Sequence, residues 1–150
     1  MSVDQALEKV VPKGSKTRAK KAETAQLIIL DSANVSHQHG GGNFSTQGLP
    51  LAVDFYKSKG FRVMAFLPDH YITHHYPDPL QDWTGLEDLV KQKILIPTPA
   101  ADYDDLYIVQ FAKKNDGFIV SNDRYRDVPL NFTDPTERTQ VAQWVKSHRI

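Results

Sequence analysis

From residue 27 onward, short apolar runs alternate with stretches whose apolar residues recur every three or four positions. The first run, Leu27-Ile28-Ile29-Leu30, contains no polar residue, which is typical of a strand buried on both faces of its sheet. Similar runs at 61–67, 94–96 and 118–120 predict three further strands. The intervening pattern predicts helices over 45–58, 84–92 and 103–114 and from 134 onward, whereas 32–43 and 68–82 are expected to be loops, the second with one short helical turn.

The predicted helix starts carry residues that are typical of helix caps. Ser45 or Thr46 can cap the first helix and Asp102 the third, while Thr84 opens a capping box. Asp134 precedes a proline in the first turn of the last helix. The order of four strand–helix pairs predicts an α/β fold with three layers, α/β/α, around a central, mainly parallel, Rossmann-like sheet of four or five strands.

The composition limits what the chain can be. With 150 residues, of which 40% are hydrophobic and 24% charged, it has the balance of one globular domain. No apolar run approaches the roughly 18 residues of a membrane helix, and no apolar signal segment precedes the first strand, so we expect an intracellular, cytoplasmic protein without membrane contact. The chain has no cysteine, which excludes disulfides and cysteine-ligated metal centres.

The net charge of zero conceals an uneven distribution. Residues 1–26 contain six basic and three acidic residues, whereas residues 27–150 contain 12 basic and 15 acidic ones. We therefore expect a mobile basic arm, 1–26, ahead of one folded domain, 27–150. The arm could contact nucleic-acid phosphates, or it could be a solvated tail that aids solubility, and both interpretations stay open.

Acidic residues fall where three of the predicted strands end. Asp31 directly follows the first strand, and Asp123 lies just past the fourth. Asp104 and Asp105 fall in the first turn of the helix after the third strand. Open α/β sheets bind ligands outside the carboxyl ends of their strands, so these four carboxylates are expected to face one crevice. Adjacent helical residues diverge by about 100°, so Asp104 and Asp105 cannot both point the same way.

Four carboxylates in one crevice repel each other unless a cation lies between them. A hard divalent ion such as Mg²⁺ or Mn²⁺ takes oxygen ligands, and on a phosphate it can activate an attacking water and neutralise the leaving oxygen. Asn34 and Asn122, close to Asp31 and Asp123, could orient a carboxylate, a water or a phosphate. Against this, a single aspartate after a strand is more often a turn former or a helix cap, and the aspartate pair could serve the helix dipole.

The same positions resemble the NYN branch of the PIN-like nucleases, and within it the Regnase-type ribonucleases, which are associated with CCCH zinc fingers. The resemblance runs from about residue 27 to residue 144 and rests on an ordered series of motifs. Leu30-Asp31-Ser32-Ala33-Asn34-Val35 is similar to the family's strand-end Asp-x-x-Asn, and Tyr103-Asp104-Asp105 to its Tyr-Asp-Asp helix. Ser121-Asn122-Asp123-Arg124-Tyr125-Arg126-Asp127 resembles its most distinctive segment.

This resemblance implies a PIN-like fold and endonucleolytic cleavage of single-stranded or loop RNA with Mg²⁺ or Mn²⁺, and it suggests self-association into a homo-oligomer. It implies that four carboxylates hold the metal, with Asn34 in support: Asp31, Asp104, Asp105 and Asp123. The polar residues that flank them are expected to bind substrate: Ser32, Asn122, Arg124 and Arg126. The two arginines could instead form a structural salt bridge with Asp127 or another acid.

Some positions depart from the family pattern. Leu106 stands where an arginine is common, Gln47 where a basic residue is common, and the segment 97–102 is short and has no basic residue. These departures imply weaker RNA affinity, or affinity supplied by the basic arm. The chain stops at Ile150, where the family continues into a further strand, and it has no CCCH zinc finger. We therefore expect the C-terminal strand of the domain to be missing.

Histidine and aromatic residues offer further candidates. His37 and His39 could bind a metal, although histidines in a glycine-rich loop are more often ordinary polar residues. His74, His75 and Tyr76, with Trp83 nearby, could stack on RNA bases, although packing beneath a long loop is the commoner role.

Three functions remain in competition. The first is a metal-dependent endoribonuclease, which the intact set of acidic residues favours. The second is a PIN-like module that binds RNA or protein with little or no catalysis, which the missing basic residues favour. The third is a Mg²⁺-dependent hydrolase of a small phosphate ester, and the absence of Asp-x-Asp after the first strand disfavours its common phosphoaspartate type.

Overall fold

The structure, a computed structural model, describes residues 25–99 and 104–150, and Asp104 without its side chain. Most of the predicted basic arm, and the predicted cap Asp102, therefore lie outside the described residues. Four strands are present in the described part: β1 (Leu27–Asp31), β2 (Arg62–Pro68), β3 (Leu95–Thr98) and β4 (Phe118–Val120). None of the helices in these residues is long and apolar enough to cross a membrane.

The four strands form one parallel sheet in the order β3-β2-β1-β4, which confirms the predicted fold class. β1 lies inside the sheet, with β2 on one side and β4 on the other. The chain therefore leaves β1 toward β2 and β3 and later returns to the opposite side of β1. Such a reversal is a topological switch point, where parallel sheets commonly bind ligands beyond the carboxyl ends of their strands.

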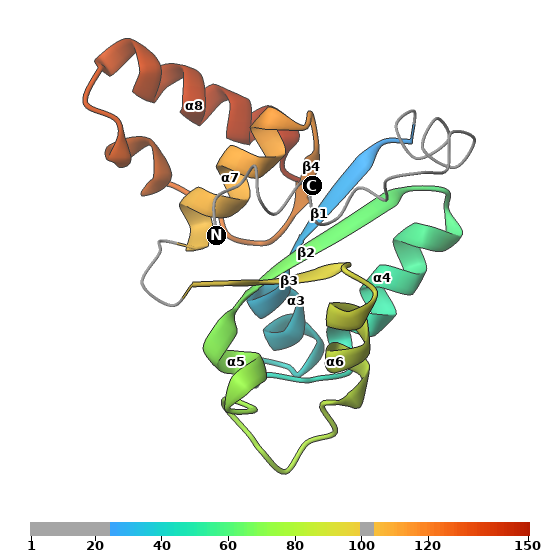
Figure 1. Cartoon of the computed structure of the whole chain (residues 1–150). Coiled ribbons are helices and arrows are strands. Elements are labelled where there is room, and N and C mark those ends of the chain that lie inside the picture. The colour runs from blue at the N-terminus through green and yellow to red at the C-terminus, as the bar shows by residue number, and fades with distance from the viewer. Residues whose placement is uncertain (1–24, 100–103) are drawn as a thin grey trace.

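Helices cover both faces of the sheet (Figure 1). One face is covered by α3 (Ser32–His39), α4 (Gly48–Ser58) and α6 (Thr84–Lys91), and the short α5 (Asp69–Thr73) follows β2. The other face is covered by α7 (Asp104–Lys114), the 3₁₀ helix η1 (Val128–Asn131) and α8 (Pro135–His148). Leu27 and Ile29 of β1 pack on the α7–α8 side, and Ile28 and Leu30 pack on the α4–α6 side. Because β1 has no solvent face, every position in it is apolar until Asp31.

The prediction of a loop over 32–43 was wrong for its first part, which forms α3. This helix begins directly after β1, and Asp31 is its N-cap, with Oδ1 accepting from the backbone N of Asn34 at 3.5 Å. The buried residues of α3 are Ser32 and Ser36. Because the inward face of this helix is polar, it lacks the apolar periodicity from which helices are predicted.

The starts of the other helices differ from expectation by a few residues. α4 begins at Gly48, and its N-cap, Gln47, makes no side-chain cap bond. The capping box expected at Thr84 was wrong: the N-cap is Trp83, and the backbone N of Thr84 donates to Asp82. The cap expected for the last helix is confirmed, because Asp134 accepts from the second helical residue of α8 at 3.1 Å.

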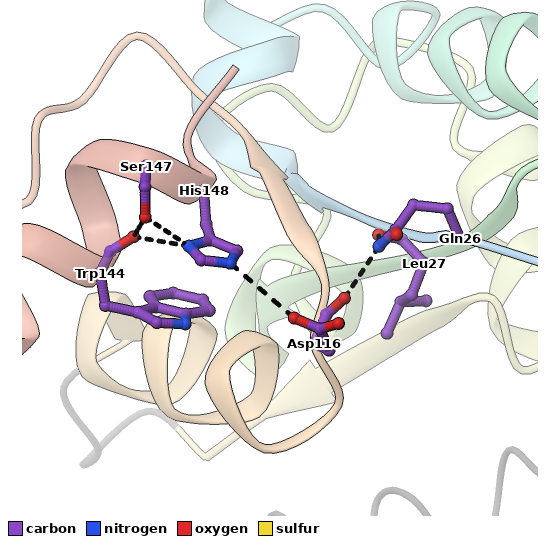
Figure 2. Close-up of polar contacts among 6 residues, drawn as sticks. All are labelled: Gln26, Leu27, Asp116, Trp144, Ser147 and His148. Atoms are coloured by element: carbon purple, nitrogen blue, oxygen red, sulfur yellow. Dashed lines mark hydrogen bonds and ion pairs between the residues drawn. The ribbon is translucent and has the colours of Figure 1, made fainter.

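Aromatic and polar contacts hold the C-terminal end of α8 near the start of β4 (Figure 2). The ring of His148 stacks on that of Trp144 with centroids 4.2 Å apart, and its Nε2 lies 3.8 Å from the carboxylate of Asp116. After α8 the chain makes an isolated parallel bridge with β4. The last turn of α8 is therefore fixed beside the strand that borders the switch point.

Candidate active site

Asp31 is the last residue of β1 and lies at the switch point, where β1 and β4 end side by side. Only 6% of the residue is exposed. Its Oδ2 accepts hydrogen bonds from the hydroxyl of Ser121 at 2.9 Å and from the hydroxyl of Tyr125 at 2.8 Å. From the part of the chain that the structure describes, its Oδ1 accepts only the longer bond from the backbone N of Asn34. The protein thus saturates Oδ2, whereas Oδ1 keeps an electron pair that a cation or a water could use.

The surroundings of Asp31 act on its pKa in opposite directions. Burial raises the pKa of Asp31, because desolvation disfavours the charged carboxylate, and the hydrogen bonds from Tyr125, Ser121 and Asn34 lower it. The negative charge of Asp123 raises the pKa of Asp31 further. Burial, and then the charge of Asp31, also raise the pKa of Tyr125, so that its hydroxyl stays protonated and remains a donor.

The segment after β4 folds into a turn that supports Asp31. The Ser121 hydroxyl accepts from the backbone N of Asp123 at 3.0 Å while it donates to Asp31. The carboxylate of Asp123 accepts from the backbone N of Tyr125 at 2.7 Å. Tyr125 itself has a φ of +52°, an uncommon value for a residue with a side chain, and its hydroxyl reaches Asp31. One hydrogen-bonded turn therefore supplies two donors to Asp31 and presents Asp123, which is exposed, as a second carboxylate.

Asn34 connects the two halves of the site. Its side-chain oxygen accepts from the backbone N of Asn122 at 3.0 Å, which ties α3 to the segment after β4. Ser32 is completely buried, and its hydroxyl has no hydrogen-bond partner among the residues described. Asn34 thus positions the backbone of the segment after β4, whereas the burial of Ser32 does not favour its predicted contact with substrate.

The aspartate pair lies at the start of α7. Asp105 is half-buried, and its charge raises the pKa of Tyr125, so it acts on the same ring that contacts Asp31. The side chain of Asp104 lies outside the described residues. Within the described side chains, no three acidic or histidine residues form a group that could hold a metal ion. The complete set of four ligands therefore stays a prediction.

With this geometry in view, comparisons with known proteins identify the family. A family model described as the Zc3h12a-like ribonuclease NYN domain matches residues 24–148. The chain belongs to this family. The resemblance recognised from the sequence motifs is thereby confirmed, and membership supports a nuclease that acts on RNA.

Solved structures show the same fold. Two structures of the nuclear protein-only RNase P 2 of Arabidopsis thaliana superpose on the NYN domain with TM-scores of 0.60 and 0.62 at 22% and 20% sequence identity. The matches cover 98% of this chain but 31% and 32% of those chains. The NYN domain thus spans about a third of their length, and at this identity the likeness shows the fold alone.

Within the described residues, the two arginines of the NYN domain do not form the alternative salt bridge. Arg124 and Arg126 are exposed, and neither makes an ion pair with a residue in the described ranges. Both line a cavity of about 430 Å³ between the segment after β4 and α8. Their charged ends are therefore available to an anion.

Several of the histidine and aromatic candidates make contacts within the NYN domain. Trp83 is 3% exposed, and its ring stacks on those of Phe44 and His75, with centroids 5.5 Å and 5.2 Å away. His37 and His39, in the last turn of α3, each contact through Nδ1 an oxygen of the loop that follows this helix. These contacts agree with a structural role for Trp83, His75, His37 and His39, whereas His74 and Tyr76 are exposed.

Two residues of the site were not singled out from the sequence: Ser121 and Tyr125. Both lie in the segment 121–127, whose resemblance to the family is the most specific. The prediction took only the charged and amide residues of that segment. A hydroxyl group that supports a carboxylate has no spacing signal of its own, because its partner lies far away in the sequence.

Proposed function

We propose that this NYN domain is a metal-dependent endoribonuclease that hydrolyses phosphodiester bonds of single-stranded or loop RNA. The observation that carries the proposal is the environment of Asp31, a buried carboxylate at the switch point that faces the added charge of Asp123. An ionised carboxylate is costly to bury unless it is paired or coordinates a metal, and among the described residues no basic side chain is bonded to Asp31. A divalent cation would offset this cost.

The chemistry of the donors fits Mg²⁺ or Mn²⁺. Both ions take oxygen ligands, and Mg²⁺ is commonly held by one or two carboxylates together with substrate phosphate. Asp31 and Asp123 would supply these carboxylates, with Asp104 and Asp105 as the further ligands that we propose. When bound, the ion lowers the pKa of an attacking water and neutralises charge on the leaving oxygen.

The residues of the chain prepare the site for this ion and the RNA. Tyr125 and Ser121 hold Oδ2, so the carboxylate of Asp31 cannot rotate without losing two hydrogen bonds. Asn34 fixes the distance between α3 and the turn that carries Asp123. Arg124 and Arg126 offer planar guanidinium groups that suit phosphate oxygens, and they would hold the substrate backbone.

Cleavage assays test the proposal directly. A circular single-stranded RNA offers no end to an exonuclease, so its linearisation in the presence of Mg²⁺ or Mn²⁺ would show endonucleolytic cutting. We expect EDTA to abolish cleavage. Loss of a residue that merely supports a metal ligand costs about 10–100-fold, so Asp31→Asn and Asp123→Asn should cost more than that.

The matched control is Asp54→Asn, since Asp54 is exposed on α4 and makes no hydrogen bond through its side chain within the described residues. It should cleave at the wild-type rate. Cleavage that survives EDTA, or that persists in Asp31→Asn, would rule out the metal mechanism.

A second candidate is an RNA-binding module with little or no catalysis. It is favoured by Leu106 and Gln47, which stand at positions where relatives commonly have basic residues. Retarded migration of RNA without cleavage at saturating Mn²⁺ would select this candidate.

A further inference from the structure

We propose that the cavity between the segment after β4 and α8 is a second subsite of the NYN domain, which binds a backbone phosphate of the RNA away from the bond that is cut. The inference rests on the proposed function, because it takes RNA as the ligand. The cavity has a volume of about 430 Å³, within the range of about 300–1,000 Å³ typical of ligand sites. Its basic lining residues come from two separate elements: Arg124, Arg126, Lys146 and Arg149.

The positive charges of this cavity have no acidic counterpart in the described structure. None of the described aspartates and glutamates lines the cavity. Arg124, Arg126 and Lys146 are exposed and make no ion pair with any residue in the described ranges. Within the described ranges, the side chain of the half-buried Arg149 donates only to the backbone carbonyl of Ser121, at 3.0 Å. Four cations around one cavity repel each other, and a bound anion would relieve that repulsion.

The cavity shares its inner wall with the candidate active site. Tyr125 lines the cavity, and its hydroxyl bonds to Asp31. Arg149 bonds to the carbonyl of Ser121, whose hydroxyl also bonds to Asp31. An anion bound in the cavity would therefore be separated from the carboxylate of Asp31 by a single residue, Tyr125. A chain with a negative charge at every nucleotide can occupy both places at once, which a small anion cannot.

The side chains suit a sugar–phosphate backbone. Three of the four cations are arginines, whose planar groups bind phosphate oxygens through paired hydrogen bonds. The wall formed by α8 also includes Ala142 and Val145, which offer an apolar surface for a ribose. Such contacts read no base, so the subsite would strengthen binding without adding sequence preference.

Two of the four basic residues that line the cavity lie outside the motifs on which the family resemblance rests. Lys146 and Arg149 lie beyond residue 144, and the packing of His148 on Trp144 holds the last turn of α8 in place (Figure 2). The last turn of α8 lies near β4 (Figure 1), and Lys146 and Arg149 from this region complete the lining of the cavity. This contribution would offset the basic residues that the chain lacks at Leu106 and Gln47.

The test measures RNA binding as a function of salt. Fluorescence anisotropy with a labelled single-stranded oligonucleotide gives the dissociation constant of wild type, Lys146→Gln and the double variant Arg126→Gln/Lys146→Gln at several salt concentrations. Each phosphate contact that is lost should lower the slope of log affinity against log salt by about 0.7 and weaken binding equally for unrelated sequences. Both side chains are exposed, so unchanged melting temperatures should confirm folding.

The matched control is Lys91→Gln. Lys91 lies in the last turn of α6, as Lys146 lies in the last turn of α8, but on the other face of the sheet. Its salt slope should equal that of wild type. Unchanged slopes in the Lys146 variants, or slopes lowered equally by Lys91→Gln, would overturn the subsite. Inorganic phosphate that binds the cavity while those RNA slopes stay unchanged would also overturn it.

Cleavage separates failure of the subsite from failure of the proposed function. If the wild type cuts RNA, the Lys146 variants should raise KM more than they lower kcat, since they act on binding away from the reacting phosphate. If the wild type does not cut RNA but the variants lower its salt slope, the subsite stands and the nuclease assignment fails. Cleavage with unchanged KM in both variants would contradict the subsite alone.

Discussion

Tyr125→Phe removes one hydroxyl from the centre of the site and keeps the ring. Tyr125 is 2% exposed, and its hydroxyl donates to Oδ2 of Asp31 at 2.8 Å. The variant retains the bond from Ser121 and loses this one. A hydrogen bond to a charged group contributes about 1.5–3 kcal/mol. Because this bond is buried, water does not weaken it, and the full range applies. We therefore expect the free energy of unfolding to fall by this amount. For a domain of this size, each kcal/mol lost lowers the melting temperature by roughly 2–4 °C.

The loss should depend on pH. Burial raises the pKa of Asp31 in the folded protein above its unfolded value, so its ionisation costs folding free energy. That cost is absent below the unfolded pKa and is complete above the folded one. The bond from Tyr125 lowers the pKa of Asp31 and so reduces the cost. The difference in stability between wild type and Tyr125→Phe should therefore grow as the pH rises through the folded-state pKa of Asp31.

Urea denaturation followed by tryptophan fluorescence, repeated from acidic to mildly alkaline pH, measures both effects. The control is Tyr56→Phe, since the half-buried ring of Tyr56 packs on Phe55 and Phe61 and its hydroxyl has no hydrogen-bond partner among the described residues. This control should cost little at any pH. The reasoning is refuted if Tyr125→Phe is no more destabilising than the control, or if its cost is the same throughout the pH range.

Three other outcomes are expected. Mg²⁺ or Mn²⁺ at about 100 times its Kd should stabilise the wild type by about 2.7 kcal/mol in a thermal melt, and an equal gain in Asp31→Asn would contradict the proposed metal site. Ser121→Ala removes a donor to Asp31 and an acceptor for the backbone N of Asp123. The free energy of unfolding should therefore fall by about 1–3 kcal/mol, and RNA cleavage should slow. Cleavage at the wild-type rate in this variant would show that these bonds do not orient the site. Asp134→Ala removes the N-cap of α8 and should lower stability by about 0.5–2 kcal/mol at an unchanged cleavage rate, whereas wild-type stability would show that the cap contributes nothing.

Whether a strand or helix could be predicted from the sequence depended on whether its buried residues are apolar. β1 and β4 were predicted at or close to their observed bounds, because strands covered on both faces are continuously apolar. The cap of α8 was predicted because Asp134 and the following proline act within one turn. α3 was missed because its inward residues are serines, and burial of a polar face depends on contacts that no local pattern records.

Some residues of the candidate site could likewise be predicted from the sequence, and others could be found only in the structure. Asp31 and Asp123 could be named from the sequence, since each follows a strand, and strands of a parallel sheet end at one edge. Tyr125 and Ser121 could not be given their roles, because those depend on an acceptor that lies 94 and 90 residues away. The basic cavity was equally hidden, since Lys146 and Arg149 join Arg124 and Arg126 only after α8 has packed beside β4.

By itself the sequence determined the order of strands and helices, the placement of aspartates after strands, and the motifs of the NYN family, because all of these depend on neighbouring residues and their periodicity. Only the tertiary structure decided that β4 lies beside β1. That pairing sets the switch point, brings the turn after β4 to the end of β1, and selects the hydroxyl groups that support a buried carboxylate. Strand order is a matter of long-range packing, and identical local patterns are compatible with several arrangements of the same strands.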